Sequence, residues 1–588
     1  MTALVPTAMV FIHLTALVVL THLVSPGGAQ TVAQQTTVST EGREFLIYPS
    51  RVPDLWDRIN LYITTQSAKL FKVRIFTPKM PVSQGGVDYD LQVSADKPIN
   101  LEFTTRGSNG ARGKLLDGVR VLAEDDIAVF VNNPSSNATG VTAILTTASL
   151  GTKYIFPSIR RTFDGQVSIC IGNLDQPNAV RITLPRAAGH LQLMYRSNVY
   201  LPGDTITVLL NDFEFADIRD SSSYVGKVSV ADLTGAEITA ERPIAVFSAA
   251  VFYPSVLLWS VSRTDKDIVI ENIPPVSSWG QKFVVTASPS ATAGDYVRVL
   301  ASQPKVTVHF SDQPEPLMLR STGEFLERSL EPGTSLQVTA DRPVGMIQYR
   351  SVFEEDSAPF LFFVPPLENY GNHYTVPMIF NEQFLPSTVN YVILVTHVCH
   401  ADRVVIRHNT DSTLNGPVST MTSWRQLGDG PYVTSHVKVK LGFVSIYMSP
   451  SSDAEEDKRA TLGGYFFGRG PQKAYAAPLG LYPPDANKTF TWVQPRTPAM
   501  AVQVAGQVVQ GRAVLVLRDK LPLSFSLEAA HVTSAARCHH RCWSRSDCAL
   551  VAYARGRQGS GRCQLYTAAG SCSGVREAPG FRLYQLMK

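Results

Sequence analysis

Five of the chain's seven cysteines lie within its last 51 residues, at Cys538, Cys542, Cys548, Cys563 and Cys572. Paired thiols at this density are typical of a small domain that needs covalent crosslinks because its core is small. Each bridge adds about 2–4 kcal/mol, mainly by restricting the unfolded chain. The other two, Cys170 and Cys399, lie far upstream. Spacing leaves open whether they pair with each other, and Cys572 is likewise unassigned.

Other chemistries have weaker signals. The run Cys538-His539-His540-Arg541-Cys542 contains potential zinc ligands. The nearby arginines and an oxidising environment argue against zinc binding, so we expect disulfides. We interpret His400 and His408 as ordinary surface residues. The acidic runs 124–126 and 453–457 do not match an EF-hand loop and are read as solvated turns. The sequence contains no nucleophile elbow, phosphate loop or His-Glu-x-x-His motif, so it predicts no enzyme, metal or cofactor.

Arginines surround the C-terminal cysteines. The segment from His531 to Lys588 contains nine basic and two acidic residues, so its net charge is near +7. The rest of the chain has a net charge near −3, which gives the total of +4. A helix that begins at Thr533 or Ser534 would align Arg537, Arg541 and Arg545, which recur every four residues. Planar guanidinium groups suit sulphate and carboxylate. The candidate ligand-binding residues are Arg537, Arg541, Arg545, Arg555, Arg557 and Arg562.

This basic segment is predicted to bind a sulphated or sialylated extracellular glycan, or an acidic protein surface. The alternative is a solvated arginine-rich face that raises solubility. Nucleic acid is a poor partner because aromatic residues do not alternate with the basic ones.

The rest of the chain repeats a phrase of nine or ten residues. Its copies are 338–347, 238–247 and 93–101, and a degenerate copy without proline is 121–130. We expect a strand, a tight polar turn and a second strand, since proline pre-sets the φ of a turn and is tolerated at a strand's first residue. The acidic residue before the proline is expected to bond backbone N–H groups of that turn.

A second phrase, glycine followed after two residues by an aromatic, recurs at Gly42, Gly151, Gly280 and Gly371. Alternating β-branched runs follow each copy, and helical periodicity is nearly absent between residues 42 and 480. The sequence predicts a mainly β fold with four tandem sandwich-like units, at 42–150, 151–279, 280–370 and 371–480. A β-propeller is the alternative, but a blade usually takes about 40–50 residues.

The two ends of the chain differ from this repeated part. Residues 1–29 lack charge and end in small residues, which predicts a secretory signal peptide. No later apolar run is long enough to span a membrane. The sequons at Asn137 and Asn487 fit a secreted, extracellular glycoprotein. A linker at 481–492 is expected before a last domain at 493–588.

That last domain resembles the PAN/apple family in its cysteine spacing, followed by Leu550–Tyr553, Cys563–Tyr566 and the closing strand Phe581–Gln585. The resemblance implies a small α+β domain with a helix packed on an antiparallel sheet. It also implies the bridges Cys538–Cys563 and Cys542–Cys548, and binding of proteins or carbohydrates. The chain departs from the family because no cysteine between residues 475 and 537 can pair with Cys572.

The repeated part is similar to the N-terminal region of the IgGFc-binding protein family, notably in residues 273–285, 296–301 and 338–344. The similarity covers about 42–480 and implies a secreted β-rich recognition region. We therefore expect a non-enzymatic recognition or adhesion protein with a basic C-terminal ligand-binding module. The alternative is a structural mucus or matrix protein that assembles through its β units and forms a disulfide-linked homodimer through Cys572.

Overall fold

The computed structural model describes most of the chain between residues 38 and 587. The described residues are 38–48, 58–104, 115–134, 139–159, 166–186, 191–220, 232–252, 267–289, 294–350, 358–380, 388–409, 418–420, 423–428, 430–450, 459–470, 473–483, 500–504, 507–522, 528–532, 550–555, 561–566 and 575–587. The predicted signal peptide and the asparagines of both sequons lie outside them.

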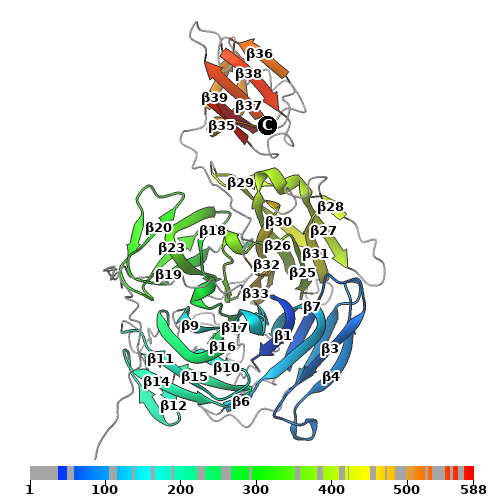
Figure 1. The fold of residues 1–588 in the computed structure, drawn as a ribbon, viewed down its shortest axis with the longest axis vertical. Helices are drawn as coiled ribbons and strands as arrows, with labels where there is room; N and C mark the ends of the chain where they lie inside the picture. The colour runs from blue at the N-terminus through cyan, green and yellow to red at the C-terminus, as the bar shows by residue number, and fades with distance from the viewer. Residues whose placement is uncertain are drawn as a thin grey trace, which may run out of the picture. The chain divides into compact units, whose positions relative to one another are not determined.

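The described chain is mainly β, as its alternation predicts, and its strands form antiparallel sheets (Figure 1). Its named helices are short 3-10 turns: η1 (Val82–Gln84), η2 (Thr147–Ser149), η3 (Val276–Ser278), η4 (Leu367–Asn369) and η5 (Val398–Arg403). The first sheet has the order β4-β3-β7-β2-β5, with β1 and β8 also paired to β7. Its strands are β1 (Glu41–Ile47), β2 (Arg58–Thr64), β3 (Phe71–Phe76), β4 (Asp88–Val93), β5 (Ile99–Thr104), β7 (Val119–Pro134) and β8 (Thr139–Ala143).

The second and third sheets repeat this plan around β16 and β23. The second contains β6 (Leu115–Asp117), β9 (Gly151–Phe156), β10 (Gln166–Asn173), β11 (Asn178–Thr183), β12 (Leu193–Tyr195), β13 (Asn198–Tyr200), β14 (Thr205–Leu210), β15 (Glu214–Asp220), β16 (Ala236–Phe252) and β17 (Asp267–Asn272). The third contains β18 (Gly280–Thr286), β19 (Asp295–Ala301), β20 (Val306–Phe310), β21 (Leu317–Leu319), β22 (Phe325–Leu330), β23 (Ser335–Arg350) and β24 (Phe360–Phe363).

A fourth region contains two separate sheets, ordered β25-β31-β27-β28 and β29-β30-β26-β32-β33. Its strands are β25 (His373–Met378), β26 (Val389–His397), β27 (Val404–Asn409), β28 (Val418–Thr420), β29 (Arg425–Gln426), β30 (Tyr432–Val439), β31 (Gly442–Met448), β32 (Leu462–Gly470) and β33 (Lys473–Pro478). We call these four sandwich-like groups the first to fourth β units. The exact boundaries that the sequence predicts for them stay predictions.

The repeated phrase forms a bulge inside one long strand, so the predicted turn is wrong for most copies. In β16, Thr239 lies opposite Lys153 and Ile244 opposite Gly151, so the longer β16 segment bulges outward. β23 and β7 are shifted in the same way against β18 and β1. Before the bulge β16 pairs with β11, and after it with β10, so the strand passes from one layer of the sandwich to the other.

One feature of the phrase agrees with its prediction, and a second agrees only in part. The copy at 93–101 does form a turn, in which Lys97 N–H donates to the carbonyl of Ser94. The acidic residue does bond backbone N–H, but on a neighbouring strand. Asp341 Oδ1 accepts from Thr307 N–H at 2.8 Å, and Glu124 Oε2 accepts from Lys72 N–H at 3.0 Å.

The fourth unit has no copy of the repeated phrase, because two separate strands replace the long strand there. β31 and β32 take the two halves of the long strand, pairing with β25 and β26 respectively. Residues 449–461 separate them, so here the chain leaves one sheet and enters the other through an insertion instead of a bulge. The acidic run 453–457 falls in this insertion, outside the described residues.

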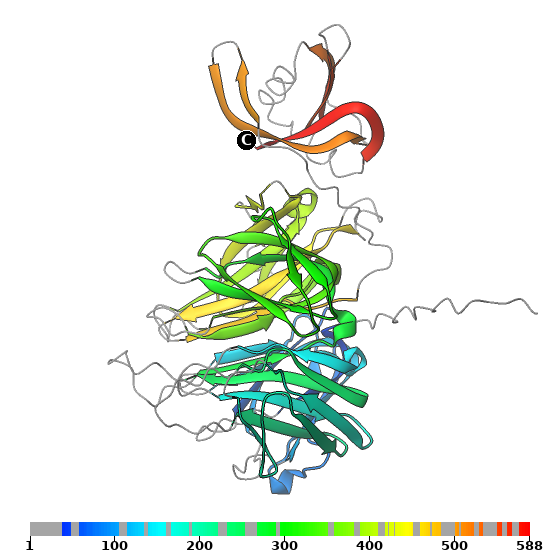
Figure 2. The same cartoon turned by 90° about the vertical axis from the view of Figure 1, so that its left-hand side faces the viewer.

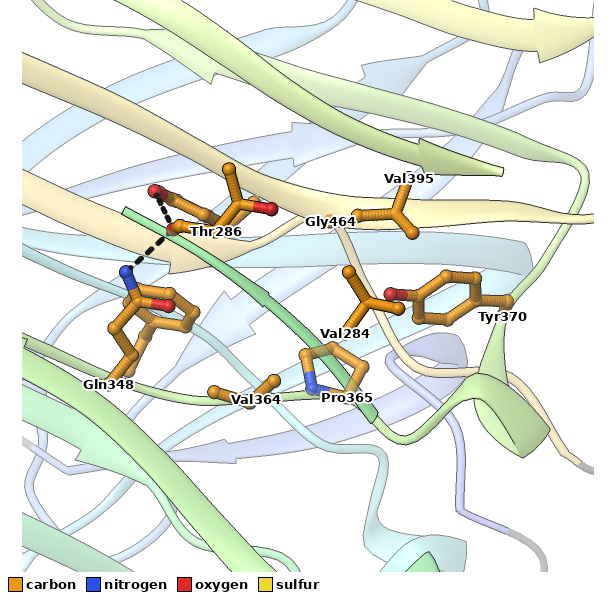
Figure 3. A pocket seen from close by; sticks show the side chains of 10 residues that line it. Val284, Thr286, Gln348, Val364, Pro365, Tyr370, Val395 and Gly464 are labelled. Carbon is orange, nitrogen blue, oxygen red and sulfur yellow. Dashed lines mark hydrogen bonds between the residues drawn. The ribbon is translucent and has the colours of Figure 1, made fainter. Parts of the chain in front are cut away.

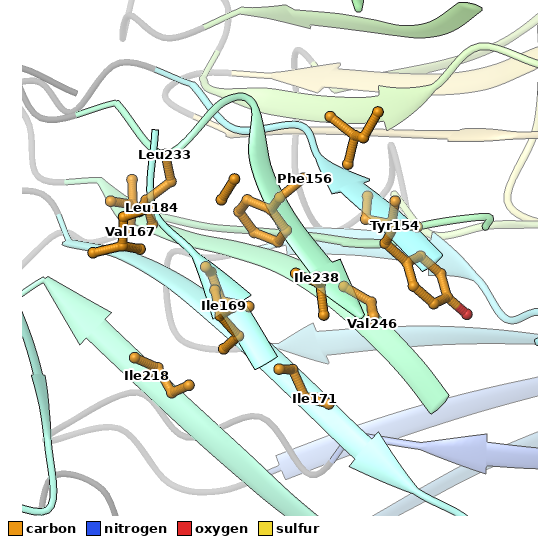
Figure 4. Close-up of a cluster of buried hydrophobic side chains, with 14 of the residues drawn as sticks. Tyr154, Phe156, Val167, Ile169, Ile171, Leu184, Ile218, Leu233, Ile238 and Val246 are labelled. Carbon is orange, nitrogen blue, oxygen red and sulfur yellow. The ribbon is translucent and has the colours of Figure 1, made fainter. Parts of the chain in front are cut away.

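Each hydrophobic core extends into the next unit. Figure 4 shows the second unit's core, which includes Tyr154, Ile169 and Val246. This core also takes in Ile347 and Phe363 of the third unit. The first core takes in residues of the second unit, the third core residues of the fourth, and the fourth core residues of the first. The contacts between units therefore form a closed cycle.

Four equivalent junctions make these contacts. We call β8, β17, β24 and β33 the inner strands. After each of them a backbone N–H donates to the long strand or its equivalent: Ile144 to Val129, Ile273 to Val246, Val364 to Met346 and Leu479 to Gly464, at 2.9, 2.8, 2.8 and 3.1 Å. The chain then crosses a glycine of the second phrase. A Cβ there would lie too close to the crossing segment, at Gly42 (2.7 Å from Thr146), Gly151 (2.6 Å from Pro275), Gly280 (2.3 Å from Pro366) and Gly371 (2.4 Å from Tyr482).

The fourth junction joins the two ends of the repeated part. Thr40 N–H donates to the carbonyl of Leu481 at 2.9 Å, and Leu481 N–H donates to Thr40 Oγ1 at 3.0 Å. Asn369 Nδ2 donates to the carbonyl of Tyr482 at 2.7 Å. Residues 481–482, predicted to begin a linker, are thus held by both the first unit and η4. Figure 2 shows the strands from a second direction.

A further sheet follows, with the order β34-β35-β39-β37-β38-β36. Its strands are β34 (Met500–Val504), β35 (Gln507–Pro522), β36 (Glu528–Val532), β37 (Leu550–Arg555), β38 (Gly561–Tyr566) and β39 (Val575–Met587). The three strands expected after the cysteine-bearing segment therefore fall within β37, β38 and β39. The helix expected at 533–545 lies outside the described residues.

A tyrosine hydroxyl stabilises the second junction, and Tyr154→Phe tests it. The Tyr154 hydroxyl accepts from Gly151 N–H at 2.9 Å and donates to the Ile244 carbonyl at 2.6 Å. Removing this buried group should lower the free energy of unfolding by about 1–3 kcal/mol. Urea denaturation measures the loss. Tyr89→Phe, at a less buried tyrosine, should change little, and an equal loss in both variants would contradict the assignment.

Candidate functional site

A buried polar cluster lies where the inner strands meet. The strands β8, β17, β24 and β33 contact one another in that cyclic order. Glu271 of β17 is 1% exposed, and its two carboxyl oxygens accept from Thr142 Oγ1 of β8 and from Phe363 N–H of β24, each at 2.9 Å. One carboxyl group therefore connects three units.

Asn272 extends this cluster toward the first junction. Its Oδ1 accepts from Leu145 N–H at 2.8 Å, and its backbone N–H donates to Thr142 Oγ1 at 3.0 Å. Its Nδ2 donates to the carbonyl of Val246 at 3.0 Å. These bonds satisfy buried backbone groups at the crossing of two units, so the cluster positions strands.

Burial changes the acidity of Glu271. Loss of solvent raises the pKa of this carboxyl to about 8, although its two hydrogen bonds act in the opposite direction. A raised pKa of this kind also occurs in general acids. Here, however, the named contacts of both oxygens are protein groups, so the geometry favours a structural role.

Other buried polar contacts join neighbouring units. The Tyr48 hydroxyl of the first unit donates to Asp217 of the second at 2.7 Å. Arg298 of the third, only 2% exposed, donates to Asp232 of the second at 2.8 Å. Between the fourth and third units the Tyr465 hydroxyl donates to the Thr286 carbonyl at 2.9 Å. Polar groups at these interfaces are used to hold the units together.

A cavity lies between the third and fourth units (Figure 3). Its volume, about 10 Å³, is far below the roughly 300–1,000 Å³ of most small-molecule sites. Apolar side chains such as Val284, Val364 and Val395 line much of it. Gln348 Nε2 donates to the Thr286 carbonyl, as the figure shows. The cavity is better explained as imperfect packing between units than as a binding site.

The histidines of the fourth unit are less exposed than the sequence suggested. His400, interpreted as a surface residue, is 4% exposed in η5, so that interpretation is wrong. Burial lowers the pKa of His408. His397 Nδ1 accepts from Cys399 N–H at 3.2 Å, and burial followed by nearby His400 lowers the pKa of His397 to about 4. η5 and His397 contact β30, which short sequence patterns did not reveal.

The upstream cysteines have different states. Cys170 in β10 carries a free, fully buried thiol whose pKa is raised well above 9.0 by burial and by Asp217. Cys399 is disulfide-bonded. These two cysteines therefore do not pair with each other. Cys538, Cys542, Cys548 and Cys572, and the side chain of Cys563, lie outside what the structure describes, so their bridges stay predictions.

The predicted arginine site is described only in part. Arg555 and Arg562 lie in the hairpin of β37 and β38, where Arg555 is opposite Gly561 and Arg562 opposite Ala554. The hairpin thus brings these two positions within one register step. Arg537, Arg541, Arg545 and Arg557 fall outside the described residues.

The described ranges give no sign of a metal site or of a membrane-spanning helix. They contain no group of three or more His, Cys, Asp or Glu that could hold a metal ion. Asp125 and Asp126 of the first acidic run contact Arg43, at 3.3 and 3.1 Å. None of the helices in these ranges has the length and hydrophobicity needed to cross a membrane.

Sequence reasoning missed the Glu271 cluster. Glu271 and Asn272 stand directly before Ile273-Pro274-Pro275, the crossing segment of the second junction. Two polar residues directly after the apolar run Ile268-Val269-Ile270 were the available signal. Their partners Thr142 and Phe363 are 129 and 92 residues away from Glu271 in the chain.

Substituting the central carboxyl should change the pH dependence of stability. Because the folded-state pKa of Glu271 is raised from 4.5 to about 8, its effect favours folding most at low pH. Stability then falls as the pH rises from 4.5 to 8, by about 1.4 kcal/mol per pH unit at most. In Glu271→Gln the amide cannot ionise, so this decline should disappear from urea denaturation curves taken at pH 5–8. Glu241→Gln, on the surface, should retain the decline. A Glu271→Gln variant with an unchanged decline would refute the cluster's titration.

The buried histidine His436 should have the opposite effect on the pH dependence of stability. Burial, followed by nearby Arg425, lowers the pKa of His436 to about 4. Its contribution is complete above pH 6.5 and is lost as the pH falls toward 4, by up to about 1.4 kcal/mol per pH unit. His436→Gln should reduce the acid loss of stability in urea denaturation at pH 7, 5 and 4. His309→Gln in the third unit serves as the control, and equal behaviour of both variants would exclude His436 as the source.

Comparison with known proteins shows which family this chain is similar to. A family model described as IgGFc binding protein matches residues 140–462. The IgGFc-binding protein of Homo sapiens is 24% identical over 189 residues, which are 32% of this chain and 3% of the human protein. The similar segment is therefore a small part of that relative. Since the family model covers more than half of the 588 residues, the chain belongs to the IgGFc-binding protein family.

Proposed function

We propose that this protein is a non-enzymatic extracellular recognition protein whose β units form a scaffold for a basic C-terminal ligand-binding module. Family membership supports a binding role. The relative's name states that it binds the Fc part of IgG, and we do not transfer that ligand. The scaffold role is supported by the buried polar groups between units, which join strands to one another.

The charge distribution is the observation that carries the proposed ligand. Residues 531–588 hold nine basic and two acidic residues, against a net charge near −3 for the remainder. Like charges at this density repel one another unless an anion compensates them. Guanidinium groups form paired hydrogen bonds with sulphate and carboxylate oxygens. A sulphated glycan fits this chemistry, and sialylated glycans or acidic protein surfaces are weaker alternatives.

The module is proposed to have a PAN/apple-like organisation. Bridges Cys538–Cys563 and Cys542–Cys548 would hold the segment that carries Arg537, Arg541 and Arg545 against the sheet. Arg555 and Arg562, already brought to one hairpin, would extend the basic face. Secretion through a signal peptide at 1–29, and glycosylation at Asn137 and Asn487, complete the proposal.

Heparin binding by the full-length protein tests this function. The triple variant Arg537→Ser, Arg541→Ser and Arg545→Ser should bind heparin at least about tenfold more weakly, since each lost charged contact costs on the order of 1 kcal/mol or more. Wild-type binding should weaken steeply with added salt because exposed charges are screened. Surface plasmon resonance across a salt series measures both effects.

A charge-matched control separates site from net charge. The exposed Arg181, Arg186 and Arg320 lie in the β units. Changing these three to Ser removes the same charge and should leave heparin binding nearly unchanged. No wild-type binding at low salt would refute the glycan proposal. Binding to desulphated heparin or to polyglutamate with equal strength would instead favour a general acidic partner.

A further inference from the structure

The state of Cys399 constrains the C-terminal cysteines. Cys399 is disulfide-bonded and lies half-buried in η5, between β26 and β27. Cys170 cannot be its partner because its thiol is free and fully buried in β10. The chain has seven cysteines, and the remaining five all lie between residues 538 and 572.

From this count we infer that a disulfide joins Cys399 in the fourth β unit to the C-terminal cysteine segment, and we propose Cys572 as its partner. Five cysteines are an odd number, so they cannot all pair among themselves. Removing one for Cys399 leaves four, enough for two bridges within the segment. The link itself rests on Cys399 and the count, whereas the choice of Cys572 rests also on the two bridges proposed above.

The local structure around Cys399 suits an anchor. Val398 N–H donates to the Pro431 carbonyl at 2.7 Å, and Cys399 N–H donates to His397 Nδ1 at 3.2 Å. At the other end of η5, the Arg403 guanidinium donates to the Ser449 carbonyl at 3.0 and 2.7 Å. The turn is thus fixed to neighbouring strands on both sides. A bond made here would transmit restraint to the fourth unit.

The chemistry requires only thiol–disulfide exchange. The two thiols, of Cys399 and Cys572, form one S–S bond and give two protons and two electrons to a protein or glutathione disulfide. That disulfide is reduced to two thiols, so the exchange balances. With three intrachain bridges, Cys170 alone retains a thiol, and no accessible cysteine is left for a disulfide-linked homodimer.

An engineered protease site tests the link directly. We place the site within residues 484–499 of the full-length protein, cleave it, and compare electrophoresis with and without reductant. The expected result is one band without reductant and two bands with it. Cys399→Ser and Cys572→Ser should each give two bands under both conditions. Cys170→Ser should behave like the parent.

Peptide mapping identifies the partner and covers variants that fold poorly. The parent protein is alkylated, digested without reductant and analysed by mass spectrometry. A crosslinked peptide pair containing Cys399 and Cys572 supports the proposal, whereas a pair that joins Cys399 to another C-terminal cysteine overturns the choice of Cys572. An alkylated Cys399, or a Cys399–Cys399 crosslink between chains, overturns the link. Heparin binding does not enter these readouts, so the link and the proposed function stand or fail separately.

Discussion

Close approach of the backbone at the four glycines of the second phrase is the constraint on which the β units depend. At each junction the crossing segment lies where a side chain would otherwise be, and contacts below 3 Å leave no room for a Cβ. This approach lets an inner strand end against the next unit and continue into its first strand. The hydrophobic cores can then merge across the junction, so that each core contains side chains from neighbouring units.

Merged cores create a problem for polar backbone groups, and the buried side chains solve it. N–H groups at the crossing points cannot reach water, and an unsatisfied buried donor is costly. Glu271, Asn272 and Thr142 accept those hydrogen bonds. A carboxyl group among apolar side chains would ordinarily suggest catalysis. Its engagement with three strands from different units instead supports a scaffold, which agrees with a family of binding proteins.

The sequence predicted the class of fold because alternation along a strand is a local property. Runs such as Phe283–Thr286 and Val306–Phe310 alternate or stay apolar, and both are strands. The phrase around Arg342 and Pro343 also fits a turn, because proline with acidic and basic neighbours is typical of turns. Whether such residues reverse the chain or bulge within it depends on pairing with Gly280 and Lys282, about sixty residues earlier. Long-range register of this kind is not encoded in composition or periodicity.

The pairing of Thr40 with Leu481 has a consequence for how the chain is threaded. Because the start and end of the repeated part meet, the order of the four units is set by contacts and not by where the chain begins. A circular permutant, with residue 483 connected to residue 38 by a short linker and new ends opened at another junction, would keep all four merged cores. Such permutation is tolerated where chain ends lie close together. The four units therefore form a closed cycle of contacts, although the polypeptide that builds them has two ends.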